Sequence, residues 1–423
     1  MSDRKSVLII SYVFPPYPGI GGRRWAKFAK YLCREGHRVH VLCAENPLYQ
    51  ESPWKKDTEA YAGKITRLPP AYPSPLLGIP CTLSEKILYR ISLFYVRMFG
   101  KGNYYDRSLF WGKRMLGTAA SIIEKEKINN VVVTGGPFRY MYNLIALKKQ
   151  FPHVNFIADF RDPWTTNRTA FGFEKLSPSR KQFELHAEKE VILNYDYITA
   201  VADEMTHYFM TLCPENSRGK CLTVRNGFDR EDFPGKIPVK QETGKHLRFL
   251  FAGTLYDKSE YIFRAFTETL DRLRQMDPAV YRDMQFEFYG TFPSRLKEMV
   301  KERKLENIKI SESIPLAEVY GKIAGASVCM LFLTMDLNYS FSTKFYEYLS
   351  QGKKIAVFSE KGKTGDYVVN NGLGYALTPG NMFEEMNRIH RDFMEGRMEI
   401  NPHFDIRPFD VSDISRKIAE LLR

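Results

Sequence analysis

The sequence has few of the features that stabilise small secreted proteins or anchor membrane proteins. Its 423 residues include only six cysteines and eight histidines, and neither type forms a Cys-x-x-Cys or His-x-x-x-His pattern. A disulfide framework and a structural zinc site are therefore not expected. The longest uncharged stretch, residues 68–84, contains five prolines, which indicates a loop rather than a membrane-spanning helix.

The N-terminus also lacks the apolar segment and the small-residue cleavage site of a signal peptide, so we expect a cytoplasmic protein. Hydrophobic residues make up 44% and charged residues 26%, which excludes disordered and fibrous classes. The net charge of +13 favours anionic partners. No nucleic-acid-binding motif accompanies this charge, so nucleic acid is not an expected partner.

Short apolar runs alternate with amphipathic helical patterns in both halves of the chain, first from Val7 and again from Leu247. This alternation predicts an α/β protein with two Rossmann-like, doubly wound domains in tandem. A polar, Gly- and Pro-containing segment separates them and predicts a linker. The expected parts are an N-terminal domain (1–228), a linker (229–245), a C-terminal domain (246–402) and a terminal helical segment (403–423) that packs back on the N-terminal domain.

Residues 70–114 interrupt the alternation of the N-terminal domain. From residue 86 to residue 114 there are seven basic side chains and one acidic side chain, with aromatic and aliphatic residues between them. Such a segment can lie on an anionic membrane surface. The alternative is an ordinary helix whose apolar side packs on the sheet.

A glycine-containing loop follows the first expected strand and leads into a helix that starts near Arg23. Gly21 and Gly22 allow a ligand to approach the backbone, and the start of the helix suits a phosphate. A dinucleotide fingerprint needs a third glycine where Arg24 stands. Glu45, after the second strand, is placed as a ribose-binding acid would be, and supports a nicotinamide-dependent oxidoreductase as an alternative.

A second motif, Asp159-Phe-Arg161-Asp162-Pro-Trp, follows an expected strand. The carboxyl ends of such strands are where open α/β sheets bind ligands. Asp159 or Asp162 is a candidate to orient a substrate hydroxyl. Arg161 is a candidate to pair with Asp159 or to hold an anion. The alternative is a purely structural Asp–Arg pair.

A third motif lies at the first strand of the C-terminal domain. Gly253 and Thr254 end that strand, and Lys258 follows at the start of the next helix. An ammonium group beside the free amides of a helix start is a candidate clamp for a diphosphate.

A fourth motif starts a helix late in the same domain. Ser342 or Thr343 is a suitable N-cap, Lys344 follows, and Glu347 lies one turn inside the helix. The Glu347 carboxylate is a candidate acceptor for the two hydroxyls of a ribose, and the alternative is an exposed helix glutamate.

Taken together, these motifs resemble glycosyltransferase family 4, whose members have the GT-B fold. The resemblance covers nearly the whole chain and rests on the order of its motifs. They are the Pro-Pro…Gly-Gly opening, Gly36-His37-x-Val39, Asp-Phe-Arg-Asp-Pro-Trp, Val224-Arg-Asn-Gly-Phe-Asp229, Gly253-Thr254-Leu255 and Lys344-Phe-Tyr-Glu-Tyr-Leu-x-x-Gly352.

The resemblance implies two domains that face each other across a cleft, with the acceptor on the N-terminal and the nucleotide sugar, UDP- or GDP-linked, on the C-terminal domain. It implies retaining transfer without a metal or cofactor, and no Asp-x-Asp motif occurs in the sequence. It assigns diphosphate binding to Lys258 and to amides near Gly22, Ser342 and Thr343, and ribose binding to Glu347. The chain differs at Thr254, usually arginine, and at Tyr339, often glutamate.

The predicted function is hexosyl transfer to a glycan or polyprenyl-linked acceptor in bacterial surface polysaccharide synthesis, at the inner face of the plasma membrane. Three alternatives stay open: a nucleotide-sugar epimerase of the same fold, a nicotinamide-dependent oxidoreductase, and a non-catalytic nucleotide-binding protein.

Overall fold

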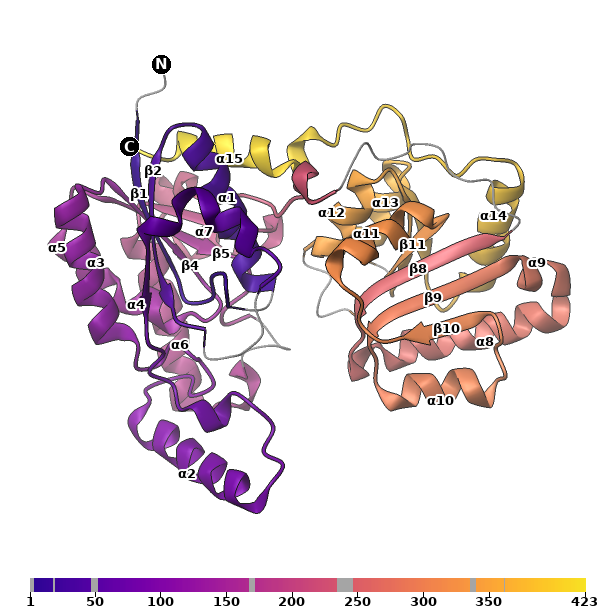
Figure 1. The fold of residues 1–423 in the computed structure, drawn as a ribbon, viewed down its shortest axis with the longest axis horizontal. Coiled ribbons are helices and arrows are strands. Elements are labelled where there is room, and N and C mark those ends of the chain that lie inside the picture. The colour runs from indigo at the N-terminus through magenta and orange to yellow at the C-terminus, as the bar shows by residue number, and fades with distance from the viewer. Residues whose placement is uncertain are drawn as a thin grey trace. The chain divides into compact units, whose positions relative to one another are not determined.

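The computed structural model describes residues 4–17, 20–46, 52–166, 172–233, 246–334, 340–360 and 362–423. The chain divides into two compact units (Figure 1). Unit 1 comprises Met1–Arg225 and Val411–Arg423, and unit 2 comprises Asn226–Asp410.

Unit 1 is built on a seven-stranded sheet in which every described pairing is parallel, in the order β3-β2-β1-β4-β5-β6-β7. The central strands are buried on both faces, which explains their unbroken apolar runs. The strands are β1 (Ser6–Ser11), β2 (Arg38–Ala44), β3 (Ile65–Leu68), β4 (Asn130–Thr134), β5 (Asn155–Phe160), β6 (Tyr197–Ala200) and β7 (Cys221–Thr223).

Helices connect these strands, as the parallel order requires. They are α1 (Arg23–Arg34), α2 (Leu83–Phe99), α3 (Gly112–Glu126), α4 (Arg139–Asn143), α5 (Ile145–Gln150), α6 (Pro178–Asn194) and α7 (Asp203–Leu212). Short 3-10 turns are η1 (Ile20–Gly22), η2 (Lys55–Lys64), η3 (Ser74–Leu76), η4 (Phe173–Lys175) and η5 (Glu215–Lys220). Helices α4 and α5 meet at Leu144, which is the C-cap of the first and the N-cap of the second.

The last helix, α15 (Val411–Glu420), belongs to unit 1 and packs beside α1 (Figure 1). Ile414 and Ile418 are buried with Phe28 of α1 in one apolar cluster. The side-chain amide of Asn130 donates to the carbonyl oxygen of Arg423 at 2.9 Å. The expectation that the terminal helix packs on the N-terminal domain is therefore confirmed.

Unit 2 contains a second parallel sheet of six strands in the order β10-β9-β8-β11-β12-β13. Its strands are β8 (Leu247–Thr254), β9 (Met284–Thr291), β10 (Ile308–Ser311), β11 (Val328–Phe332), β12 (Lys354–Phe358) and β13 (Gly374–Leu377). Its helices and turns are η6 (Arg230–Asp232), η7 (Asp257–Ser259), α8 (Glu260–Met276), α9 (Pro278–Asp283), α10 (Ser294–Glu302), α11 (Leu316–Gly325), α12 (Thr343–Ser350), α13 (Lys363–Asn370), α14 (Met382–Met394) and η9 (Arg407–Phe409).

Both sheets have a point at which the strand order reverses, between β1 and β4 in unit 1 and between β8 and β11 in unit 2. In open parallel sheets, ligands bind outside the carboxyl ends of the strands at this point. The predicted motifs follow β1 and β5 in unit 1, and β8 and β11 in unit 2. The fold therefore places the candidate residues at the ligand-binding edge of each sheet.

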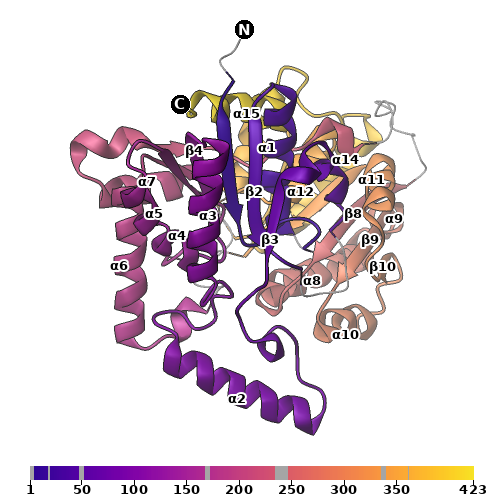
Figure 2. The ribbon, with the colours of Figure 1, turned by 60° about the vertical axis from the view of Figure 1, so that its left-hand side comes forward.

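The expected linker, 229–245, begins at Asp229, the N-cap of η6, and its residues 234–245 lie outside the described part of the chain. The insertion between β3 and α3 forms η3 and α2, and α2 extends away from the sheet of unit 1 (Figure 2). No helix among the described residues is long and apolar enough to cross a membrane.

Candidate functional site

Two glycines at the carboxyl ends of β8 and β9 bring the strand backbones close together. Gly253 pairs with Gly290, and their φ angles are +142° and +141°. A Cβ atom on Gly290 would overlap the carbonyl of Gly253, and a Cβ atom on Gly253 would overlap the side chain of Lys344. The glycine that the sequence singled out therefore makes room for a lysine 91 positions further along the chain.

Lys344 lies against the end of β8 in an environment that is poor for a charge. Its Nζ atom is 5.1 Å from the ring centroid of Phe251, a cation–π distance. Burial lowers the pKa of Lys344, and the nearby charge of Glu347 partly offsets this effect. An anion bound beside Nζ would stabilise the protonated amine.

The start of α12 supplies further donors beside this lysine. Ser342 is the N-cap residue, with φ −66° and ψ 158°, but its side chain makes no capping hydrogen bond. Among the described residues, the buried Ser342 hydroxyl has no hydrogen-bond partner. Thr343 opens the helix, and Glu347, only 8% exposed, lies one turn inside it. A helix start with an uncommitted hydroxyl suits an anionic group.

Thr254 and Lys258 follow on the same edge of the sheet. Thr254 ends β8, Lys258 lies in η7, and both side chains are exposed. The structure thus gathers Gly253, Lys344 and the start of α12 at the switch point of unit 2, with Lys258 on the solvent side of the adjoining turn.

Asp159 of unit 1 is fully buried at the end of β5 and accepts five hydrogen bonds. Arg24 donates from Nε at 3.2 Å and from Nη2 at 2.9 Å, and Trp25 donates from Nε1 at 2.7 Å. The hydroxyls of Thr134 and Thr199 donate at 2.9 and 2.8 Å. The carboxylate therefore joins α1 to the neighbouring strands β4 and β6.

These contacts decide the charge of Asp159. Burial alone would raise the pKa of its carboxyl group, but the charge of Arg24 and the hydrogen bonds from Arg24, Trp25 and Thr199 lower it below its ordinary value. An ionised carboxylate with five donors and no exposed surface has little capacity to accept a substrate hydroxyl. The predicted contact of Asp159 with an acceptor is therefore disfavoured by its packing, which instead suits the structural alternative.

Arg161, two residues further on, is arranged differently. Its guanidinium lies against Gly21, where a Cβ atom would overlap it, and Nη2 donates to the carbonyl oxygen of Gly136. Within the part of the chain that the structure describes, Nε and Nη1 are buried without hydrogen-bond partners. Asp162 Oδ2 is 4.0 Å from Nε, beyond hydrogen-bond distance. The predicted residue Gly21, on the loop after β1, is therefore a neighbour of Arg161, which with Asp162 follows β5.

Gly22 is the N-cap of α1, and a Cβ atom there would lie 3.1 Å from Cδ of Pro15. Gly19, the first glycine of this loop, lies outside the described residues, as does Tyr339 of the fourth motif. Glu45 directly follows β2 and is exposed.

Sequence reasoning missed two buried glutamates on α6 that hold the segment after Asp162. Glu184 accepts from Nε1 of Trp164 at 2.7 Å and from Arg139. Glu188 accepts from the backbone N–H and the hydroxyl of Thr165 and from the hydroxyl of Tyr208. Their spacing of four residues on a helix was the available signal, because it places both on one helix face.

Arg139 is the first residue of α4. Its guanidinium is buried against Glu184 and lies 4.3 Å from the ring centroid of Phe183. These contacts commit it to the interior of unit 1.

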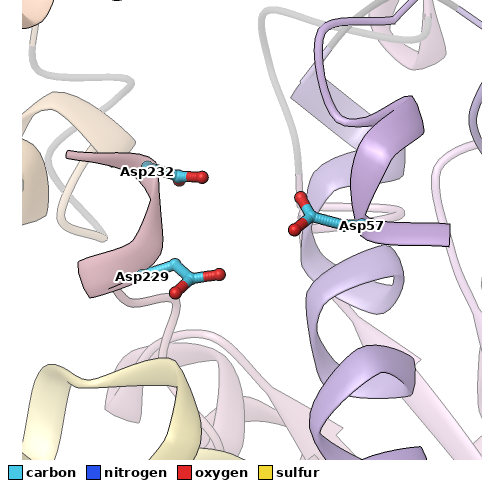
Figure 3. A group of neighbouring side chains, drawn as sticks. All are labelled: Asp57, Asp229 and Asp232. Atoms are coloured by element: carbon cyan, nitrogen blue, oxygen red, sulfur yellow. The ribbon is translucent and has the colours of Figure 1, made fainter. Parts of the chain in front are cut away.

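Three further aspartates, Asp57, Asp229 and Asp232, are drawn in Figure 3. Asp57 lies on η2 of unit 1, where Lys27 and Lys30 donate to it at 3.1 and 2.9 Å. Asp229 and Asp232 lie at the two ends of η6 in unit 2, and Asp229 accepts from the N–H of Glu231. Because Asp57 is neutralised within its own unit and the other two belong to the second unit, we assign no metal site to them.

No family model matches the chain, and no curated protein matches it. Solved structures do match it over nearly its whole length. Sucrose-phosphate synthase from Thermosynechococcus elongatus matches with a TM-score of 0.59 at 12% sequence identity. The match covers 99% of this chain and 95% of that protein. A trehalose 6-phosphate synthase from Burkholderia multivorans matches with a TM-score of 0.56 at 10% sequence identity. The match covers 99% of this chain and 96% of that protein.

A protein described as a UDP-N-acetylglucosamine 2-epimerase from Listeria monocytogenes matches with a TM-score of 0.55 at 10% sequence identity. The match covers 99% of this chain and 95% of that protein. At these identities the likeness shows the fold alone. It confirms the predicted α/β architecture with two parallel sheets, the GT-B fold.

Proposed function

We propose that this chain is a retaining, metal-independent glycosyltransferase that uses a nucleoside-diphosphate sugar. The acceptor in this proposal is a glycan or a polyprenyl-linked glycan of bacterial surface polysaccharide synthesis, extended at the inner face of the plasma membrane. In the reaction, the bond between the anomeric carbon and the terminal phosphate oxygen breaks. The nucleoside diphosphate departs with the bonding electrons, the acceptor oxygen bonds to that carbon, and the proton of the acceptor hydroxyl passes to the departing phosphate oxygen.

The observation that carries the proposal is the group of residues at the switch point of unit 2. Lys344 is seated against Gly253, and the uncapped start of α12 with the Ser342 hydroxyl lies in the same short segment. A departing nucleoside diphosphate needs cations and N–H donors to stabilise its negative charge. Lys344, Lys258 and the α12 amides are proposed to supply them, and Glu347 to accept from the ribose hydroxyls.

In unit 1, the proposal gives separate tasks to the residues of the second motif. Arg161 has two buried donor atoms beside Gly21 that find no partner among the residues described, and it is proposed to bind an anionic or strongly polar part of a substrate. Asp162, whose side chain is 37% exposed, is the better candidate to orient an acceptor hydroxyl. Asp159 is proposed as a positioning residue, because its five hydrogen bonds fix α1 and the loop before it.

Binding is tested first with the full chain. Isothermal titration with UDP, GDP, ADP, dTDP, CMP and NADH, with and without EDTA, is expected to show one preferred nucleoside diphosphate whose affinity EDTA does not change. Exclusive binding of NADH would favour the oxidoreductase instead. Binding of a nucleotide without turnover of any donor sugar would favour a non-catalytic nucleotide-binding protein.

Two substitutions test the proposed roles in unit 2. Lys258→Ala should lower turnover about 100-fold or more, as loss of one stabilising group for a developing anion does. Glu347→Gln should weaken nucleotide binding about 10-fold, because a charge-assisted hydrogen bond becomes a neutral one. Lys301→Ala and Glu312→Gln, at exposed positions elsewhere in unit 2, are the matched controls. Wild-type turnover in Lys258→Ala would contradict the role of that lysine.

An epimerase is the second candidate, because a UDP-N-acetylglucosamine 2-epimerase is among the solved structures with this fold. An epimerase needs no acceptor. Incubation of the nucleotide sugar alone, followed by chromatography of the sugar products, separates the two functions: a new epimer without acceptor would overturn the transferase proposal.

A further inference from the structure

Helix α2 exposes an unusual amount of apolar surface. Ile91, Phe94 and Met98 are 60%, 65% and 63% exposed. Ile87, Leu88 and Phe99 on the same helix are also more than half exposed. A folded chain rarely leaves so many large apolar side chains together in water unless they form a binding surface.

The exposed side chains lie on one face of the helix. At about 100° per residue, the exposed apolar positions from Leu83 to Phe99 lie within one arc of roughly 160°, which also contains Ser84. Lys86, Arg90 and Arg97 fall next to one another along one border of this arc. We call the arc and its basic border the α2 face. A helix of this kind lies in the plane of a membrane interface, with apolar side chains in the lipid and cations at the headgroups.

The helix is held firmly to unit 1 on its other side. Val96 is fully buried in an apolar cluster with Tyr104. Arg180 of α6 donates to the carbonyl oxygens of Gly100 and Gly102, both at 2.7 Å. The α2 face is therefore the side of the helix that is exposed to solvent, and Figures 1 and 2 both show α2 at the periphery of unit 1.

Only one acidic residue, Glu85, lies on α2, and it is occupied at the helix start. Its carboxylate accepts from the N–H groups of Cys81 and Thr82 at 2.7 and 3.0 Å, which completes a capping box with the Thr82 hydroxyl. These hydrogen bonds lower the pKa of Glu85. The cations along the border of the α2 face therefore have no acidic partner within the helix.

We propose that the α2 face docks unit 1 on an anionic lipid membrane surface, with the helix lying in the interface. Charge complementarity selects this occupant over a second copy of the chain. An antiparallel two-fold pairing of α2 faces would place the basic borders of both copies side by side, and like charges repel. The inference rests on α2 alone and does not depend on the proposed transferase activity.

Flotation of the full chain with vesicles tests this docking. We expect binding to phosphatidylcholine vesicles that contain about 30 mol % phosphatidylglycerol, and much weaker binding to pure phosphatidylcholine. Higher salt should weaken the binding. The double variant Ile91→Gln/Phe94→Gln should reduce partitioning about 100-fold, because two exposed apolar side chains no longer enter the lipid. Met276→Gln/Met394→Gln, at exposed sites of unit 2, is the matched control and should bind like the wild type.

A second pair of variants tests the charges. Lys86→Glu/Arg90→Glu should reduce binding to anionic vesicles at least 10-fold, whereas Lys297→Glu/Lys301→Glu on α10, with the same change of net charge, should have little effect. Equal losses in both variants, or no binding to anionic vesicles, would overturn the proposal. So would a dimer in sedimentation velocity that Ile91→Gln/Phe94→Gln abolishes, since the face would then join two copies. Vesicle binding without sugar transfer would leave this inference intact and contradict only the proposed activity.

Discussion

Glu188 of α6 is buried among hydrogen-bond donors, and no described cation forms an ion pair with it. It accepts from Thr165 and Tyr208. Burial raises the pKa of its carboxyl group to about 7 from an ordinary value of 4.5, although the hydrogen bonds partly offset the rise. The folded state therefore binds this proton more tightly than the unfolded chain does. A neutral isostere, Glu188→Gln, removes the titration and keeps groups that can pair with Thr165 and Tyr208.

The size of the effect follows from these two pKa values. The stabilising contribution of the protonated group is fully present below pH 4.5 and is lost as the pH rises through 7. One pKa unit corresponds to about 1.4 kcal/mol, so the free energy of unfolding should fall by about 3 kcal/mol over this window. For a unit of this size, that loss lowers the unfolding midpoint by several degrees. Glu188→Gln should lack this part of the pH dependence.

The assay is urea unfolding followed by tryptophan fluorescence at pH 4.5, 6 and 8. All four tryptophans, Trp25, Trp54, Trp111 and Trp164, belong to unit 1, so the signal reports this unit alone. Glu190→Gln, at a half-buried position on the same helix, is the control and should retain the wild-type pH dependence. If the wild type and Glu188→Gln lose the same stability between pH 4.5 and 8, the reasoning about this carboxyl group is refuted.

Three further substitutions test other parts of the structure. Asp159→Asn should lower the free energy of unfolding of unit 1 by about 3–5 kcal/mol in urea, because it leaves the buried Arg24 without its counter-charge; a loss below 1 kcal/mol would contradict the positioning role. Gly253→Ala should weaken nucleotide binding in calorimetry at least 10-fold, since the added methyl group requires a strained backbone and displaces Lys344. Unchanged affinity would show that Gly253 and Lys344 are not part of the nucleotide site. Asn130→Ala should make the C-terminal residues after α15 more sensitive to carboxypeptidase, because the side chain that binds them is lost; equal digestion would show that apolar packing alone holds them.

Local sequence patterns were sufficient to predict the α/β class and most central strands. Buried parallel strands read as apolar runs such as residues 7–10 and 131–133, because both faces of the sheet are covered. Sequence reasoning missed β3 and β13, two of the four strands at sheet edges in the described chain. β3 has four residues that are half-buried or exposed, and β13 starts at Gly374, so neither has the composition that marks a central strand.

The candidate site was predicted in part. The glycine loop, the Asp-Phe-Arg-Asp motif and the starts of two helices were placed at strand ends by the sequence alone, because strand and helix order follows from local periodicity. The burial of these side chains depends on hydrogen-bond partners that lie far away in the sequence. Asp159 receives donors from residues 24, 25, 134 and 199, and no local pattern shows that all five hydrogen bonds converge on one carboxylate.

The sequence by itself determined the chemistry that was available: a basic chain, glycines before helix starts, and a basic, apolar segment at residues 86–114. Only the tertiary structure decided how these groups are used. It buried Asp159 and Glu188, seated Lys344 on Gly253, and left the apolar arc of α2 in solvent. The physical reason is that periodicity along the chain fixes which side of an element is apolar, whereas burial, pKa and exposure depend on which distant segments pack against that side.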